Sequence, residues 1–339
     1  MLNHITWIRA IAIFMIIFIH SDGVGRMLYQ PSDFAPTIDY SIKIFFREAT
    51  CLFMLISGFL FQHLIHKYTF TKYIKSKLKN VIIPYVLISI PAILIYVLSF
   101  KTDHNWIDLH QLKQHSIPYQ VMFFLLTGSH LGPLWFIPAV TVIYLMSPIL
   151  YFLDKRNCYF IALPCLIIFF AITTRPSGDS NPILAALHFL PIYVTGMFIS
   201  RYRDFFYLRF AISVTISLFI YFVLSLVSFQ YDNLWGLQKV AFFIIIYLIL
   251  RRYESLIIQR NPVLASAVDF IGLISFGLYF VHGYFAGIGR LIITKIDLFH
   301  GNVYATIFFV DVIIFSLSIG FILIFKLIFN KKSKVLVGC

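Results

Sequence analysis

The sequence predicts an all-α membrane protein: a polytopic bundle of about ten transmembrane helices with one short re-entrant or interfacial segment. Of the 339 residues, 60% are hydrophobic and only 12% are charged, which leaves too little polar surface to cover a soluble core. Apolar runs of about 20 residues, the length that crosses a bilayer, also recur along the whole chain. We therefore expect a single membrane-embedded domain over residues 1–339.

The order of the spans follows from the apolar runs and the basic residues between them. The first two spans are expected near 4–21 and 41–62, and the loop after them carries lysines at positions 67, 72, 75, 77 and 79 without an acid. Cytosolic loops are enriched in Lys and Arg, so this loop and the N-terminus are placed inside. The remaining spans are expected near 81–100, 134–153, 158–174, 184–200, 208–228, 236–250, 267–288 and 302–329.

One apolar segment, 118–128, is too short to span and is soon followed by Gly128, Gly132 and Pro133. Irregular backbone at membrane depth is tolerated only inside protein or along a cavity, which indicates a re-entrant or interfacial piece. If this piece does not cross, every strongly basic cluster falls on one side of the membrane. This arrangement predicts a multi-pass protein of the cell inner (plasma) membrane with both termini in the cytosol.

The composition also argues against several functional classes. The net charge of +13 is mostly explained by basic cytosolic loops rather than by nucleic acid, although a pocket for an anionic ligand could explain the remainder. The four cysteines show no metal-ligand spacing, and no GxSxG, HExxH, Walker or Rossmann motif is present. No metal and no bound cofactor are expected.

Two ionisable residues in the first span are costly to place in a bilayer and are functional candidates for that reason. Arg9 and His20 are eleven residues apart, which is about three helical turns. They therefore lie on the same face of the helix, separated by about 16 Å along its axis. A guanidinium suits a thioester, phosphate or carboxylate, and an imidazole suits proton abstraction from a hydroxyl. Alternatively, Arg9 snorkels to a lipid phosphate and His20 caps the helix at the interface.

Other candidates have an equally plain structural alternative. Arg47 and Glu48, in the outer third of the second span, could pair with other helices or take part in chemistry. The polar stripe of one late span, Ser275, Tyr279 and His282, follows i, i+4, i+7 and could be packing. Trp135 could be an anchor in the aromatic belt at the membrane interface, or a stacking surface for a sugar ring. The basic loop could be a topology determinant or could hold an anionic ligand.

These residues occur in blocks that resemble the acyltransferase-3 family of membrane acyltransferases. The blocks appear in family order over most of the chain, although the family more often has Arg where this chain has Lys before the third span. They are Trp7-Ile-Arg9 with His20; Phe45-Phe46-Arg47 with Ser57-Gly58-Phe59-Leu60; Tyr73-Ile-Lys75-Ser-Lys77-Leu-Lys79 before Pro84-Tyr85; Gly132-Pro133-Leu134-Trp135-Phe136 with Tyr144 and Ser147-Pro148; and Ser275-Phe-Gly277-Leu-Tyr279-Phe-Val-His282.

The resemblance implies transfer of an acyl group, usually acetyl, from cytosolic acyl-CoA to a hydroxyl of a cell-envelope polysaccharide, such as lipopolysaccharide, or of a lipid-linked sugar. It implies that His20 is a general base or transient acyl carrier, and that Arg9 and Arg47 orient the donor or stabilise the thioester oxygen. The CoA phosphates would meet Lys75, Lys77 and Lys79. The acceptor side would be supported by Glu48, Trp135, Ser275, Tyr279 and His282. Acetyl-CoA is then a co-substrate, and the partners are the glycan acceptor and membrane lipids.

Two other functional classes remain open from the residues alone. A transporter or flippase for a polar or anionic solute would also place charges inside a helix bundle. It would predict inverted repeats and broken helices in matching halves of the chain, and no such repeat is visible in the sequence. A non-catalytic scaffold would leave Arg9 and His20 dispensable.

Overall fold

The multi-pass helical fold is confirmed. The computed structural model describes residues 3–30, 33–104, 106–176, 181–293 and 302–339, and every regular element within these ranges is a helix. Among the described residues, eight helical segments are long and apolar enough to cross a membrane. They are Asn3–Leu28, Pro36–His63, Phe70–Val97, Pro182–Arg201, Phe210–Val227, Asp232–Arg260, Pro262–Ile292 and Val303–Phe329.

The predicted short segment ends in a sharp bend. Helix α7 (Ile117–Thr127) is followed by the segment Gly132–Leu145, and the two are inclined at 77°. Gly128 occupies the left-handed region at φ +72°, which a residue with a Cβ adopts at a cost. If the two bent helices are counted together as one span, they form a ninth. The turn Gly132–Trp135 between them is partly buried in the protein.

The two spans predicted directly after the bend are not single long helices. The span expected at 134–153 is divided between α8 (Phe136–Leu145) and α9 (Ser147–Lys155). Pro148 follows directly after this division, and a proline cannot donate a backbone hydrogen bond to a continuing helix. The span expected at 158–174 is α10 (Tyr159–Ile172), a shorter apolar helix of 14 residues.

The basic segment after the second span is mostly helix rather than loop. Helix α4 (Phe70–Lys77) continues through a π-helical turn (Leu78–Ile82) into α5 (Ile83–Val97). Lysine is a good helix former, so the predicted third span gains about three additional turns on its basic side. The lysines of this segment therefore lie along a helix and point to different sides of it.

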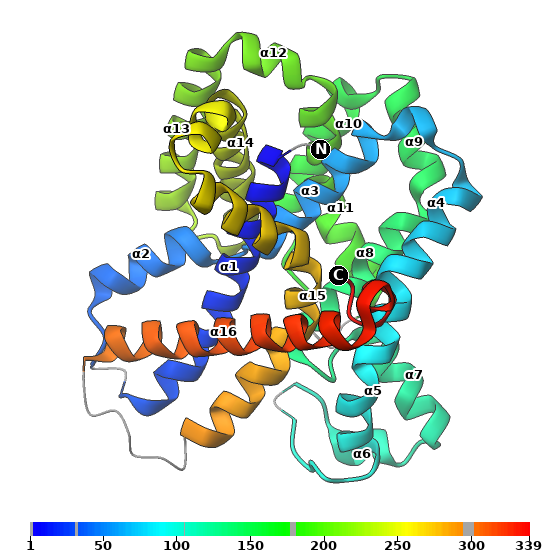
Figure 1. Ribbon diagram of the computed structural model, residues 1–339. Coiled ribbons are helices and arrows are strands. Elements are labelled where there is room, and N and C mark those ends of the chain that lie inside the picture. Colours follow the sequence, from blue (N-terminus) through cyan, green and yellow to red (C-terminus); the bar gives the residue numbers. More distant parts are fainter. Residues whose placement is uncertain (1–2, 31–32, 105, 177–180, 294–301) are drawn as a thin grey trace.

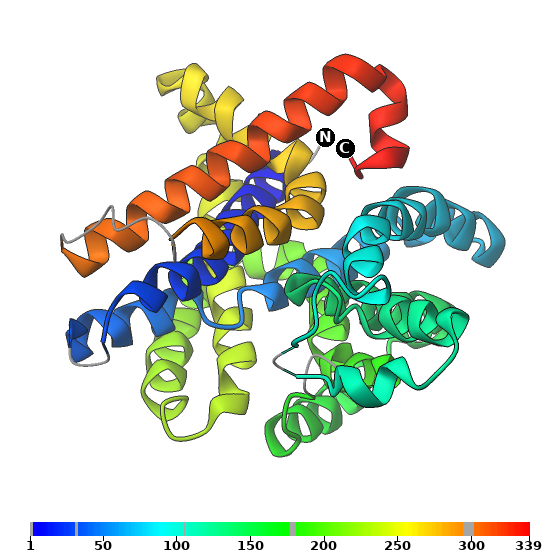
Figure 2. The same cartoon turned by 90° about the horizontal axis from the view of Figure 1, so that it is seen from below.

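Helix α1 (Asn3–Gly25) lies at the centre of the bundle (Figure 1). It packs against α15 (Pro262–Ile293), α16 (Val303–Phe329) and α14 (Trp235–Arg260), and α15 and α16 run beside it in Figure 2 as well. Two polar contacts join its N-terminal end to neighbouring helices: Trp7 Nε1 donates to Asp269 Oδ1 at 2.8 Å, and His4 Nδ1 lies 2.7 Å from Glu254 Oε2.

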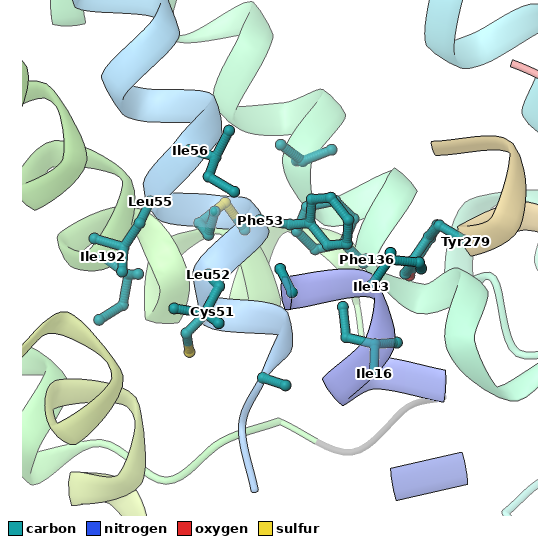
Figure 3. Close-up of a cluster of buried hydrophobic side chains, with 14 of the residues drawn as sticks. Ile13, Ile16, Cys51, Leu52, Phe53, Leu55, Ile56, Phe136, Ile192 and Tyr279 are labelled. Carbon is teal, nitrogen blue, oxygen red and sulfur yellow. The ribbon is translucent and has the colours of Figure 1, made fainter. Parts of the chain in front are cut away.

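The hydrophobic core joins α1 to helices that follow it in the chain. Figure 3 shows Ile13 and Ile16 of α1 near Leu52 and Phe53 of α3 (Thr50–His63). Helix α11 (Pro182–Arg201) contributes Ile192 to the same cluster. Without a hydrophobic driving force in lipid, such helices associate by close packing, often at small residues. Gly58 of α3 and Gly196 of α11 serve this purpose, because a Cβ at either one would collide with the backbone of the other helix.

We expect Gly58→Ala to destabilise the protein, because its added methyl meets the carbonyl oxygen of Tyr193. Overpacking of this kind typically costs about 1–3 kcal/mol. The thermal midpoint of the detergent-purified protein should fall by several degrees. Gly320→Ala in α16 is the matched control, because no atom lies within 4 Å of its added Cβ. Equal midpoints for the two variants would contradict the close packing of α3 on α11.

Candidate functional site

The second span is broken where two predicted site residues stand. Helix α2 (Pro36–Phe46) ends before Arg47, and α3 begins at Thr50. We expected Arg47 and Glu48 on one continuous helix, and this was wrong: Arg47 is extended and Glu48 has φ +56°. A positive φ is uncommon for a residue with a side chain and persists only where its surroundings enforce it.

Two buried side chains stabilise this break. In an unbroken helix the Ile44 carbonyl would accept a bond from the N–H of Glu48. Here it accepts bonds from Gln238 Nε2 and Lys239 Nζ, each at 2.9 Å, and Lys239 Nζ also donates to Gln238 Oε1 at 2.5 Å. Both side chains are fully buried in α14. A carbonyl released within the membrane needs such donors, because no water replaces them in hydrocarbon.

The break opens onto a cleft of about 560 Å³, a volume within the usual range of small-molecule sites. Four of the predicted site residues line it: His20, Arg47, Glu48 and Trp135. They come from α1, the break and the turn before α8. The structure therefore brings together candidates from three separate blocks of the sequence.

The charged side chains of this cleft are largely paired with one another. Arg26 reaches Asp22 at 2.7 Å and forms a two-pronged contact with Asp39 at 2.9 and 3.1 Å. Arg175 pairs with Glu48, and its guanidinium lies 4.7 Å from the centroid of the Trp135 ring. A cation over an indole face is attracted by the ring quadrupole. Trp135 is therefore a wall of the cleft with a guanidinium on its ring.

Arg47 also lines the cleft, but its guanidinium is engaged on the surface. Its Nη2 donates to Asp232 Oδ2 at 2.7 Å, and the Asp232 side chain is 67% exposed. Exposed ion pairs contribute little stability, so a ligand could take over this cation at small cost. The expected donor-binding role of Arg47 stays a prediction.

His20 faces a second histidine across the helix interface. The ring centroids of His20 and His282 are 5.3 Å apart. His282 is fully buried in α15, and its Nδ1 donates to the Leu278 carbonyl at 3.1 Å. Its Nε2 has no hydrogen-bond partner among the described residues. A buried unpaired ring nitrogen is costly, and His282 stands behind His20 without lining the cleft itself.

The other two members of the α15 stripe have structural roles in this arrangement. Tyr279 donates its hydroxyl to the Pro133 carbonyl and so ties α15 to the turn that carries Trp135. Ser275 donates to the Gly272 carbonyl within its own helix at 2.8 Å and is fully buried. Neither residue lines the cleft. They stabilise the elements around the cleft without forming part of its lining.

Arg9 lies apart from the cleft, three turns along α1 toward the N-terminus. It is half-buried, and no hydrogen bond or ion pair joins it to the described part of the chain. A guanidinium within a membrane span normally pairs with an acid, a carbonyl or water. Its five donors are therefore available to an anionic or carbonyl-bearing ligand.

The three predicted donor-binding lysines do not form one set. Lys75 and Lys79 are exposed, four residues apart on one face. Lys77 points the other way, with its Nζ 4.3 Å from the centroid of the Tyr144 ring and 5.1 Å from that of Tyr73. An ammonium held over two tyrosine rings contributes by cation–π attraction. Lys77 therefore has a structural partner that Lys75 and Lys79 lack.

Several residues of the site were missed from the sequence. Lys239, which supports the break, stands inside an apolar run, the same feature that selected Arg9, and is buried. The remaining residues stand in or near loops, where charge is ordinary and nothing in the sequence marks them. They are Asp22, Arg26, Asp39, Lys43 and Arg175.

Comparison with known protein families identifies the family of this chain. Within the described ranges, no three His, Cys, Asp or Glu side chains are grouped to hold a metal ion. A family model described as an acyltransferase domain matches residues 2–327, nearly the whole chain. The chain belongs to the acyltransferase-3 family. No curated protein and no solved structure matches it. The protein is thus a multi-pass membrane acyltransferase, and the resemblance seen in the sequence is confirmed.

We expect Arg175→Gln to lower the thermal midpoint, because it leaves the Glu48 carboxylate largely buried without its partner. The double variant Glu48→Gln with Arg175→Gln should recover part of this loss, because no charge is then stranded. The coupling is measured as a double-mutant cycle. Arg47→Gln is the control, since its partner Asp232 is exposed and the change should be small. Additive effects of the two single changes would show that Glu48 and Arg175 are not coupled.

Proposed function

We propose that this acyltransferase moves an acetyl group from cytosolic acetyl-CoA to a hydroxyl of a cell-envelope polysaccharide or lipid-linked sugar. The observation that supports this most is the position of His20, a titratable ring on the central helix that borders the cleft. The cleft has the size of a small-molecule site and carries an aromatic wall at Trp135. These are the features that a hydroxyl-bearing sugar needs.

In the proposed reaction His20 acts as general base. It takes the proton of the acceptor hydroxyl as that oxygen attacks the thioester carbonyl carbon. A carbon–oxygen bond forms and the carbon–sulfur bond breaks. The CoA thiolate leaves and takes the proton back from the imidazolium, so the products are the O-acetyl ester and CoA. His282 lies beside His20 and would orient it within the pair.

The donor is proposed to enter from the opposite side of the membrane. The exposed Lys75 and Lys79 would hold the CoA phosphates at the cytosolic surface, where the N- and C-termini also lie. The pantetheine arm would pass the free guanidinium of Arg9 on its way to His20. Arg9 would polarise the thioester oxygen or hold the arm in place. In this scheme the protein lies in the cell inner membrane.

We expect His20→Ala to reduce acetyl transfer by about 100- to 10,000-fold, the usual worth of general-base catalysis. The KM for acetyl-CoA should change little, because the lost interaction belongs to the transition state. Transfer is measured in membrane vesicles with labelled acetyl-CoA and envelope glycans. The matched control is His66→Ala, an exposed histidine of the Ile65–Lys67 turn, which should accumulate and react normally. Near-normal activity of His20→Ala would rule out its role.

We expect replacement of Lys75 and Lys79 by Gln to raise the KM for acetyl-CoA, with a loss that depends on ionic strength, since exposed charges are screened over about 8–10 Å. Lys155→Gln, an exposed cation at the end of α9, is the control and should behave as wild type. An unchanged donor KM in the double variant would leave these two lysines as topology determinants only.

The sidedness of the donor is tested in the same vesicles, with acetyl-CoA supplied on one face at a time. Transfer should require donor on the face that carries Lys75 and Lys79. Arg9→Lys should be damaging although it keeps the charge, because an ammonium does not reproduce a planar fork. Equal transfer with donor on the other face would contradict passage of the donor past Arg9.

A further inference from the structure

Two carboxylates of the cleft each have one oxygen without a hydrogen-bond partner. Asp22 and Glu48 line the cleft together with His20. Asp22 Oδ1 and Glu48 Oε2 are buried and accept no hydrogen bond within the part of the chain that the structure describes. A carboxylate oxygen has two lone pairs to offer, and leaving it buried and unpaired is costly. A ligand that brings hydrogen-bond donors into the cleft therefore gains binding energy at these two residues.

The other oxygen of each carboxylate is held by a guanidinium. Arg26 Nε donates to Asp22 Oδ2 at 2.7 Å, and Arg175 Nη1 donates to Glu48 Oε1. The Asp22 side chain is also 93% buried as a residue, with 7% exposed. A carboxylate that is fixed through one oxygen presents the second oxygen in a defined direction, which lowers the entropic cost of binding a donor. The two free oxygens are therefore held in place before a ligand arrives.

A third acid of the cleft shows that this arrangement is not general. Asp39 also lines the cleft, but its two oxygens accept from Nη1 and Nη2 of Arg26 at 3.1 and 2.9 Å. Such a two-pronged contact uses both oxygens of the carboxylate for the guanidinium. Asp39 thus fixes Arg26, whereas Asp22 and Glu48 each keep an oxygen in reserve.

The pairing with arginine decides which kind of donor fits. Because each of the two carboxylates already has a guanidinium at hydrogen-bond distance, an ammonium or metal ion gains little further attraction there. A hydroxyl needs only the free lone pair, and its bond to an ionised carboxylate is stronger than a bond between neutral groups. An ionised phosphate supplies acceptors rather than donors. The cleft is therefore suited to a hydroxyl-rich group and not to the phosphates of CoA.

We propose that Asp22 Oδ1 and Glu48 Oε2 each accept a hydrogen bond from the acceptor, which is thereby recognised through two hydroxyls besides the one that is acylated. The inference rests on the proposed function, in which His20 activates the reacting hydroxyl. A site built to bind a hydroxyl discriminates strongly against an analogue that lacks it. Asp22 and Glu48 are then the residues that determine which sugar is acylated.

The first test measures which hydroxyls the protein binds. The probe is the deacylated repeating unit of the envelope saccharide that gains an acyl group only in cells with the gene, identified by mass spectrometry. Analogues that each lack one hydroxyl are compared with it by calorimetric titration of the full-length protein in nanodiscs, without acetyl-CoA. Two hydroxyls besides the acylated one should each contribute about 10- to 100-fold to the Kd, as is usual for bonds to charged groups. Equal affinity for all analogues would overturn the inference.

Substitutions then assign the two hydroxyls to their partners. Asp22→Ala should weaken binding of the parent saccharide, and the analogue that lacks the hydroxyl bound by Asp22 should lose nothing further. Glu48→Ala should do the same for the other hydroxyl. These couplings form double-mutant cycles, whereas a purely structural role would weaken binding of parent and analogues alike. Persistence of both penalties at full size in the two variants would contradict the proposal.

Two milder variants keep the test decisive if an alanine variant does not accumulate. Asp22→Asn and Glu48→Gln preserve the shape of the side chain and should reduce the same penalties, because a bond to a neutral amide is weaker than one to a carboxylate. Asp39→Asn is the matched control. Both penalties should remain at full size in it, since the oxygens of Asp39 are used by Arg26. Loss of either penalty in this control would show that the effect is not specific to the free oxygens.

Transfer of labelled acetyl in the same preparations separates this inference from the proposed function. Transfer to a saccharide whose affinity depends on no such pair of hydroxyls would overturn the inference and leave the function intact. If no envelope saccharide gains an acyl group, the proposed function fails and the inference fails with it. For an acceptor with a free amino group, N-acetylation should leave the Kd unchanged. A large loss of affinity would show that the carboxylates bind an ammonium instead.

Discussion

The site depends on one constraint, which is that backbone groups released inside a bilayer must find partners within the protein. The second span gives up its helix at Arg47–Ala49, and the Ile44 carbonyl is satisfied by Gln238 and Lys239 of α14. With this support Glu48 can adopt a left-handed conformation and turn toward Arg175. Lys239 belongs to a different span and does not line the cleft, but its hydrogen bond stabilises the backbone that carries Glu48 into the cleft wall.

The same constraint explains why α1 is central. It carries His20 and Arg9, and its neighbours α14, α15 and α16 supply the contacts that hold it at depth. Trp7 and His4 tie its N-terminal end to Asp269 and Glu254 through polar side chains. Such ties restrict the helix along its axis and in rotation, and so restrict the direction in which His20 faces. A proton acceptor is effective only when it is held within reach of the reacting hydroxyl.

The charges of the cleft are matched to one another. Its cations and carboxylates are paired at short range, so the field that a ligand meets there is locally balanced. A site with paired charges favours polar hydroxyl-rich groups over an isolated ion. His20 borders this cleft from the central helix.

Much of this protein follows from its sequence. The apolar runs determine a multi-pass helical bundle, because bilayer thickness fixes the length of a span, and the bend after residue 127 follows from Gly128 and the short apolar segment before it. Arg9 and His20 are selected by the cost of burying an ionisable group. Tertiary structure decided the rest. The break at Glu48 could not be predicted, because the donors that permit it lie almost 200 residues away in α14. For the same reason Arg175 appeared as an ordinary loop residue. Its role arises from the approach of Glu48 and Trp135, and pairing between distant segments is set by packing rather than by local pattern.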